Sequence, residues 1–435
     1  MIKLSRKFVA LTGASVLFAA FSLGANASLD TKFTRQCKPL APETGEEPKT
    51  KPGLLSPRVY KQLEKARIAI GEKKFADAKQ ALDAAVTNTK EGTYQRALID
   101  QTYAYIALSQ SKYVEAARYF EKALQGDSLP YKPKMNMQRN LANAYAAADQ
   151  YDKALKAMQD WFKDAFAPKS QDYALLAQIY SQLDKTREMI CPTYYAIKLD
   201  KKANKNYYSL LLAGHWELED FPGSAEILRT MIDHFPEEST YWSQLVSIYL
   251  KLDQPADALA VAELGYKNNL WQKESDLKRL SQLYALQEVP YKAAQVMQKG
   301  IEENKIESNE KHWKSVAGNW HLAHELDKAL VGYERAGRLA SDGEHFMRMG
   351  NIYVEREDWK KAIDAYNKAL GKGGMKANDT GRVLLNKGIA QFQAGNSNAA
   401  IATLEKAQKY DNVSNNASQW KNHIRSTAKS LAAAG

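Results

Sequence analysis

Cysteine, glycine and proline are scarce in this 435-residue chain, and each shortage excludes a class of fold. Two cysteines allow at most one intramolecular disulfide, so the chain is not a small scaffold held by disulfides. Only 23 glycines and 13 prolines are present, which excludes a collagen-like chain and disfavours β folds with many tight turns. Hydrophobic residues make up 45% of the chain, enough to build a core.

Sequence motifs of catalysis are also lacking. The chain has no G-x-S-x-G, P-loop, dinucleotide-binding glycine pattern or H-E-x-x-H, and no zinc-type cysteine pairs. His312, His321 and His324 lie near one another in the sequence, but no third close ligand is evident, so we expect ordinary packing or surface histidines. The sequence therefore predicts a non-enzymatic protein with no cofactor and no metal.

Long runs of one charge are absent, although the formal net charge is +11. Lysines are spread along the chain beside glutamates, as in the stretch Lys299 to Glu303, and no basic run reaches five. This pattern favours solvated helix surfaces over a nucleic-acid site. Weak attraction to anionic envelope surfaces stays open as an alternative.

The one long uncharged run lies at the N-terminus. Lys3, Arg6 and Lys7 precede residues 8–23, which carry no charge, and Ala25-Asn26-Ala27 follows with small residues at both recognition sites. This three-part pattern predicts a signal peptide cleaved after Ala27 and export to the periplasm. A retained membrane anchor is the alternative, but the run is shorter than a bilayer span. We predict no transmembrane segment after cleavage.

Residues 28–57 are rich in proline and predict an extended arm rather than a domain. The arm carries Cys37, and the only other cysteine is Cys191, so one intramolecular pairing exists. Because the periplasm is oxidising, we predict a Cys37–Cys191 disulfide that ties the arm to the main body. The alternative is a packed Cys191 thiol, with Cys37 free or paired with a partner protein.

From residue 58 to 412 the hydrophobic pattern is helical and repeats about every 35 residues. Each copy has an anchor residue at a helix start, followed by small, bulky and small residues three, seven and ten positions later, which share one helical face. A second helix precedes each anchor. The ten anchors are Phe75, Tyr113, Tyr151, Thr186, Phe221, Pro255, Pro290, Leu326, Trp359 and Ser397.

These units resemble the tetratricopeptide repeat, a 34-residue helix–turn–helix unit. The run Trp242 to Tyr249 is similar to its first-helix signature, and Glu357 to Ala362 is similar to its turn and second-helix start. The resemblance implies an all-α fold: a right-handed superhelical solenoid of about ten helix pairs. Residues 413–435 predict a final helix that covers the last repeat, with Trp420 and Ile424 on one face.

The fourth copy departs most from the pattern. Thr186, Met189 and Thr193 replace the usual residues, and Pro192 interrupts the second helix. Because proline has no N–H and clashes with the preceding turn, we expect a kink or a late helix start there.

The resemblance also implies that certain first-helix residues line a groove that holds partner segments. Arg139 with Asn143 is similar to half of the family's carboxylate clamp, but Leu175 occupies the place of a clamp asparagine. A polar groove for some protein segment is therefore the better interpretation. The candidate groove residues are Asn136, Arg139, Asn143, Gln178, Trp216, Lys278, Gln282, Lys314 and Asn351.

Two kinds of function fit these features, and both involve protein partners of the envelope. A signal peptide, a proline-rich arm with one cysteine and a long repeat array resemble, in layout, the exported tetratricopeptide proteins of gammaproteobacterial TonB systems. That resemblance implies a periplasmic scaffold beside the TonB, ExbB and ExbD machinery of iron-complex uptake. The alternative is a scaffold for envelope or cell-wall biogenesis.

Overall fold

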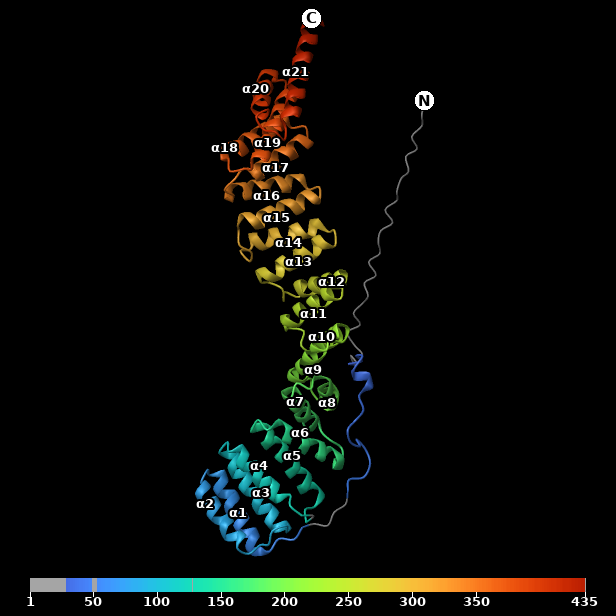
Figure 1. Ribbon diagram of the computed structural model, residues 1–435, viewed down its shortest axis with the longest axis vertical. Coiled ribbons are helices and arrows are strands. Elements are labelled where there is room, and N and C mark those ends of the chain that lie inside the picture. Colours follow the sequence, from blue (N-terminus) through green and yellow to red (C-terminus); the bar gives the residue numbers. More distant parts are fainter. Residues whose placement is uncertain (1–28, 49–52, 127, 435) are drawn as a thin grey trace, which may run out of the picture. The chain divides into compact units, whose positions relative to one another are not determined.

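The computed structural model describes residues 29–48, 53–126 and 128–434, and every regular element within these residues is a helix (Figure 1). The predicted signal peptide, residues 1–27, lies outside the described residues. The helices group into two compact units, one up to Pro236 and one from Glu237 onward, and each is described by itself.

The first unit contains a 3₁₀ turn in the arm and five helix pairs. Its elements are η1 (Thr34–Gln36), α1 (Pro57–Gly71), α2 (Phe75–Val86), α3 (Tyr94–Ser109), α4 (Tyr113–Ala123), α5 (Tyr131–Ala147), α6 (Tyr151–Asp164), α7 (Ser170–Gln182), α8 (Thr186–Leu199), α9 (Lys205–Glu217) and α10 (Phe221–His234).

The second unit contains five further pairs and a final helix. Its elements are α11 (Ser239–Lys251), α12 (Pro255–Lys267), α13 (Glu274–Leu286), α14 (Pro290–Glu302), α15 (Glu310–Leu322), α16 (Leu326–Leu339), α17 (Glu344–Glu355), α18 (Trp359–Lys372), α19 (Ala377–Gln393), α20 (Ser397–Ala407) and α21 (Ser414–Ala434).

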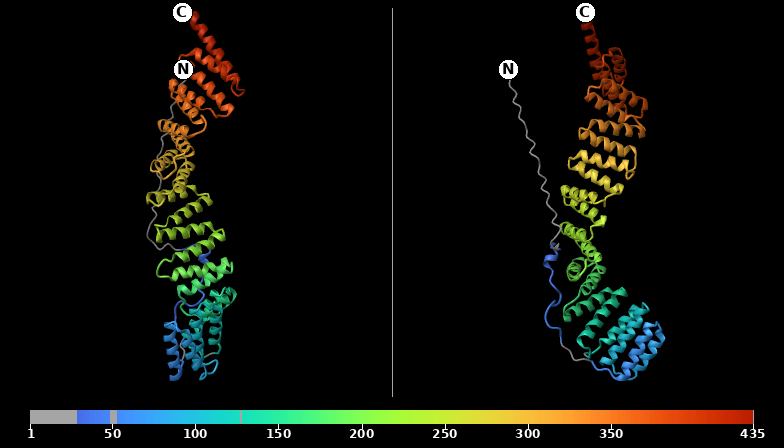
Figure 2. Two further views of the ribbon diagram at one scale, coloured as in Figure 1. Left: turned by 90° about the vertical axis from the view of Figure 1, so that its left-hand side faces the viewer. Right: turned by 180° about the vertical axis from the view of Figure 1, so that it is seen from behind.

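All ten predicted anchors are the first residues of second helices, from Phe75 of α2 to Ser397 of α20. The positions three, seven and ten residues after each anchor are buried in every copy. In α18, for example, these are Ala362, Tyr366 and Ala369, all fully buried. The alternation of small and bulky residues lets the neighbouring first helix approach closely, so the helices of each pair lie side by side (Figure 2).

The turn within each pair has the same backbone in all ten copies. The residue two positions before each anchor has a positive φ, from 53° at Asp184 to 84° at Gly395. The next N–H donates to the carbonyl four residues before that left-handed residue, as Val289 does to Tyr284 at 2.8 Å. This is the Schellman ending of a helix, which normally favours glycine at the left-handed position. Here Gly395 is the single glycine among the ten.

Helix α8 of the fourth pair begins at Thr186 and continues through Pro192 to Leu199. The expected late helix start is therefore wrong, and no break occurs at Pro192. Pro192 leaves the Glu188 carbonyl without a helical N–H donor. One residue further along, the Thr193 hydroxyl donates to the Met189 carbonyl at 2.8 Å, and both side chains are buried.

The arm returns along the first unit instead of extending away from it (Figure 1). Its turn η1 contacts α8, and the Cys37–Cys191 disulfide joins the arm to the middle of that helix. Further along, the N–H of Ala167, in the loop before α7, donates to the Pro42 carbonyl at 2.8 Å. The chain then enters α1 at Pro57, where Ser56 caps the helix.

Helix α21 covers the end of the second unit, as the sequence indicates. Ala417 and Ile424 are fully buried and share a hydrophobic cluster with Leu404 and Ala407 of α20. Trp420 is partly buried against the same cluster. The last repeat therefore does not leave its apolar side exposed.

Candidate protein-binding surfaces

The candidate groove residues all lie on the first helix of a pair, and we call the surface formed by these helices the first-helix face. Neighbouring first helices touch directly at several places, including α1 with α3, α5 with α7, and α17 with α19. Because helices repeat every 3.6 residues, positions spaced by three and four project from this face together.

The first-helix face of the first unit contains an apolar hollow of ≈ 440 Å³ between α1 and α3. Tyr60 is 56% exposed there and Tyr105 is 38% exposed. The hydroxyl of Tyr105 accepts hydrogen bonds from Gln101 at 3.1 Å and from Asn140 at 3.2 Å. The lining residues are Leu55, Tyr60, Leu63, Glu64, Arg67, Ile70, Leu98, Gln101, Thr102 and Tyr105.

Carboxamide side chains follow the hollow along the same face. Asn136 and Asn143 of α5 and Gln178 of α7, predicted from the sequence, are all exposed, and Gln171 accompanies them. A carboxamide both donates and accepts hydrogen bonds, so this row matches the N–H and C=O groups of a peptide backbone. Trp216 of α9 is 50% exposed and makes an edge contact with Phe221 at 5.6 Å.

Arg139, a candidate groove residue, is paired with a buried carboxylate of the next first helix. Its Nη1 lies 3.2 Å from Oδ1 of Asp172, whose side chain is 4% exposed. The same carboxylate accepts the Lys169 N–H at 2.8 Å at the start of α7. Because removing one partner of a buried ion pair strands the other charge, Arg139 has a structural role between the third and fourth pairs.

On the second unit the predicted cations are half exposed and each has a carboxylate partner. Lys278 lies 3.1 Å from Glu274, and Lys314 lies 3.5 Å from Glu344. Hydrogen bonds from Lys278 and from Arg348 hold the pKa values of Glu274 and Glu344, respectively, below their usual range. Because such exposed pairs contribute little to stability, a partner could compete for them.

Gln282 and Asn351 differ in how far their carboxamides are engaged by contacts within the chain. Gln282 of α13 is exposed. Asn351 of α17 accepts a hydrogen bond from the Tyr366 hydroxyl at 2.7 Å, and Asn386 lies 3.4 Å away. The carboxamide oxygen of Asn351 is thus used inside the solenoid, and its role as a groove contact stays a prediction.

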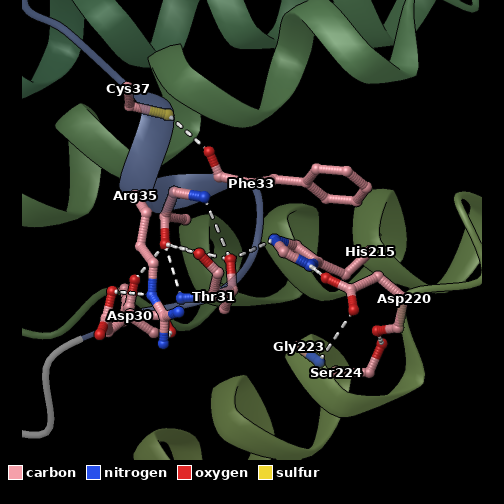
Figure 3. A network of polar contacts seen from close by, with 11 residues as sticks. Asp30, Thr31, Phe33, Arg35, Cys37, His215, Asp220, Gly223 and Ser224 are labelled. Atoms are coloured by element: carbon pink, nitrogen blue, oxygen red, sulfur yellow. Dashed lines mark hydrogen bonds and ion pairs between the residues drawn. The ribbon is translucent and has the colours of Figure 1, made fainter.

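The arm is anchored by a buried polar network (Figure 3). Thr31 Oγ1 lies 3.3 Å from Nε2 of His215 in α9, and Nδ1 of His215 lies 2.9 Å from Asp220 Oδ2. Asp220 caps α10 by accepting the Gly223 N–H at 3.3 Å. A side chain at Gly223 would meet Asp220 Oδ2 at 2.3 Å, so glycine is needed for this close approach.

Thr31, His215 and Asp220 are linked in the sequence hydroxyl, imidazole and carboxylate, as in a catalytic triad. Their burial instead indicates that they fix the arm in place. Their exposures are 3%, 0% and 9%. The Thr31 hydroxyl also contacts Thr34, and the Phe33 ring lies 5.3 Å from the imidazole. The guanidinium carbon of Arg187 lies 4.2 Å from the centre of the Phe33 ring. Burial lowers the pKa of His215, which favours the neutral ring.

One comparison with known protein families agrees with the repeat pattern. A family model described as tetratricopeptide repeat matches residues 347–417. Residues 347–417, from α17 to α21, are thus similar to the tetratricopeptide repeat. A tetratricopeptide repeat protein from Parabacteroides merdae is 16% identical over 61% of this chain and 99% of its own, with a TM-score of 0.36. MamA from AMB-1 is 14% identical over 40% of this chain and 91% of its own, with a TM-score of 0.34. No curated protein matches in sequence.

Among the residues that the structure describes, none of the helices combines the length and apolarity that a membrane span requires. Within the same residues, no group of three or more His, Cys, Asp or Glu side chains is placed to hold a metal ion. His312 is buried with Nδ1 2.8 Å from the Glu307 carbonyl, His321 lies 3.8 Å from Glu355, and His324 occupies a turn.

The apolar hollow of the first two pairs was missed from the sequence, although a signal for it was present. Tyr60 and Leu98 occupy the same position, relative to their anchors, as Asn136 of the third repeat. In this register the first two copies carry an aromatic and an aliphatic residue where the third to fifth copies carry the amides Asn136, Gln171 and Asn206.

Proposed function

We propose that this protein is an exported scaffold that binds protein partners through its first-helix face. The observation that carries the proposal is the apolar hollow between α1 and α3, continued by the exposed carboxamides of α5 and α7. An apolar side chain of a partner would enter the hollow, and its backbone would pair with the amides. Tetratricopeptide repeats as a fold support a protein-interaction role.

Export to the periplasm is part of the same proposal. The predicted signal peptide supports it, and so does the disulfide, because disulfides persist in oxidising compartments and are rare in the cytosol. N-terminal sequencing of the native protein should begin at Ser28. Recovery of Met1 in a membrane fraction would contradict export by cleavage.

For the partner we propose the TonB, ExbB and ExbD machinery, with envelope or cell-wall biogenesis complexes as the second candidate. The support is the layout of signal peptide, proline-rich arm and repeat array. The chemistry of the first-helix face is compatible with either group, so the identity of the captured protein decides between them.

Site-specific photo-crosslinking in the native host tests the surface. A photoreactive residue would replace Tyr60 in the hollow, Gln178 in the amide row, or the exposed Gln80 of α2 as a control on a second helix. We expect one shared adduct at the first two positions and none at Gln80. Adducts at Gln80 alone would place recognition on another face, and mass spectrometry of the adduct would separate TonB components from cell-wall enzymes.

Charge reversal gives a second test, with the variants chosen by the structure. Lys278→Glu and Lys314→Glu should weaken capture by the second unit without unfolding it, since both pairs are exposed. Arg139→Glu is unsuitable, because it would place a second carboxylate beside the buried Asp172. Circular dichroism beside the capture assay separates loss of binding from loss of fold.

A further inference from the structure

We propose that residues 36–48 of the arm are a strap that is released when the Cys37–Cys191 disulfide is reduced. Release would uncover an aromatic surface on α7 and α8 that the strap now occupies. The proposal concerns the arm side of the first unit and is independent of what binds the first-helix face.

The surface under the strap is a run of packed aromatic rings. Phe162 lies 5.0 Å from Tyr173, and Tyr173 stacks on Tyr195 at 5.2 Å. Ala41 of the strap belongs to the same core cluster. The Leu40 N–H donates to the Tyr173 hydroxyl at 3.1 Å. With the strap in place, Tyr173 and Tyr195 are 0% and 4% exposed.

Beyond the disulfide, the strap contacts the body through hydrogen bonds at Leu40 and Pro42, the buried Ala41 side chain and exposed ion pairs. From Arg35 to Pro48, Ala41 is the single buried residue. The strap contains three prolines, which have no N–H to donate. The ion pairs of Glu43 with Lys198 at 4.0 Å and of Glu47 with Lys132 at 3.1 Å are solvent-exposed and therefore contribute little. The covalent bond is the main tether of this stretch.

The segment before the strap is held differently. Leu29, Thr31, Phe33 and Thr34 are all buried, and Thr31 joins the His215 network. This anchor does not depend on a covalent bond. We therefore infer that reduction opens the strap as a loop, fixed at the anchor on one side and at α1 on the other, and that reoxidation can close it again.

The chemical step is thiol–disulfide exchange with a dithiol reductant. One thiolate of the reductant attacks a sulfur of the Cys37–Cys191 bond and forms a mixed disulfide, which the second thiol resolves. The reductant becomes a disulfide, and two electrons and two protons pass to the chain as two cysteine thiols. Both cysteines are partly exposed, so a reductant can reach the bond. The sulfur of Cys37 lies 3.6 Å from the Phe33 carbonyl oxygen, an acceptor ready for the new thiol.

Amide hydrogen exchange on the full chain, with and without dithiothreitol, tests the proposal. Ala167 is the reporter, because its N–H donates to the Pro42 carbonyl of the strap. We expect exchange at Ala167 and Leu40 to become at least tenfold faster on reduction. A glutamate-specific protease should also cut after the exposed Glu43, which Thr44 follows, at least tenfold faster. Amides of α9 and of the second unit should exchange at unchanged rates.

Two variants make the result decisive. Cys37→Ser with Cys191→Ser should show the fast exchange with or without dithiothreitol. Ala41→Gly in the oxidised chain removes a strap contact but keeps the bond, and should stay within threefold of the wild type. Slow exchange at Ala167 in the reduced wild type would overturn the proposal, since the strap would then hold without the bond. Loss of helical circular dichroism on reduction would also overturn it, because the bond would then be a structural staple.

Discussion

The two units are built from the same repeat but differ in what has been added to it. Both have five helix pairs with buried small and bulky residues at matching positions. The first unit carries an arm, a disulfide and a hollow lined by aliphatic and aromatic side chains. The second carries ion pairs along its first helices and a terminal helix that covers its end.

This difference distinguishes the positions that determine the fold from the positions available for partner recognition. The positions that stack one helix on the next follow the repeat in both units, and they tolerate little change because the interior is close-packed. The first-helix face is free to vary, so it carries the hollow and the amide row in the first unit and the half-exposed Lys278 and Lys314 ion pairs in the second. The arm belongs to no repeat, and its contacts are specific to the first unit.

The largest expected effect is common to both units and comes from a buried charge at a stacking position. Gly350→Asp should destabilise the second unit by about 4 kcal/mol or more, because a Cβ there would lie 2.4 Å from the Tyr366 ring and the carboxylate would have no partner. Ala329→Asp should act in the same way, since Ala329 is fully buried. Urea unfolding followed by circular dichroism measures the loss.

Gly371→Asp is the matched control. It lies in α18 of the same unit, is exposed, and has no atom within 4 Å of the position its Cβ would take. Its effect should stay within about 0.5 kcal/mol. Equal destabilisation by Gly350→Asp and Gly371→Asp would mean that helix propensity, rather than stacking, sets the stability of the unit.

Removing the disulfide should lower the free energy of unfolding of the first unit alone, since the second unit has no such link among its described residues. Cys37→Ser with Cys191→Ser opens a link between residues 154 apart in sequence, and loss of a native disulfide typically costs about 2 to 5 kcal/mol. We expect the urea transition of the first unit to move to lower urea while that of the second stays in place. A parallel shift of both transitions would show that the two units do not unfold independently.

Acid should weaken the first unit through His215. Burial lowers the pKa of His215 below its ordinary value of 6.5, so below about pH 6.5 the unfolded chain takes up a proton that the folded chain resists. The free energy of unfolding should therefore fall as the pH drops from about 7.5 to about 5, by less than the disulfide contributes. Urea unfolding of the first unit at several pH values measures this slope.

His215→Asn is the control for the acid effect, because the asparagine amide can donate to Asp220 but does not titrate. The pH slope should become flatter in this variant. An unchanged slope would assign the acid sensitivity to another group.

The sequence predicted the second-helix starts and the buried positions of each repeat. It did not predict the specific polar contacts that lie outside this pattern. A period of about 35 residues identifies every second-helix start, because the same three buried positions recur ten times. The Thr31–His215 contact joins a segment outside the repeats to one within them, so no period could reveal it. The Arg139–Asp172 pair was within reach, since the two residues are 33 positions apart and lie on successive first helices.

The smallest expected effect concerns the turns, where one copy differs from the other nine. Gly395 has a φ of 84° and no atom within 4 Å of the position a Cβ would take, so Gly395→Ala tests backbone conformation alone. A left-handed conformation costs an L-residue about 1 kcal/mol, and Gly395→Ala should destabilise the second unit by that amount.

Glu357→Gly, at the equivalent turn with a φ of 58°, makes the reciprocal change in the same unit. It relieves the left-handed strain but gives the unfolded chain more conformational freedom, so the gain should be smaller, about 0.5 kcal/mol or less. Thermal unfolding of the two variants and their double mutant measures the change in stability that each substitution causes. Because the turns are well separated, the two effects should add. A destabilising Glu357→Gly would mean that the glutamate side chain, rather than its backbone, stabilises that turn.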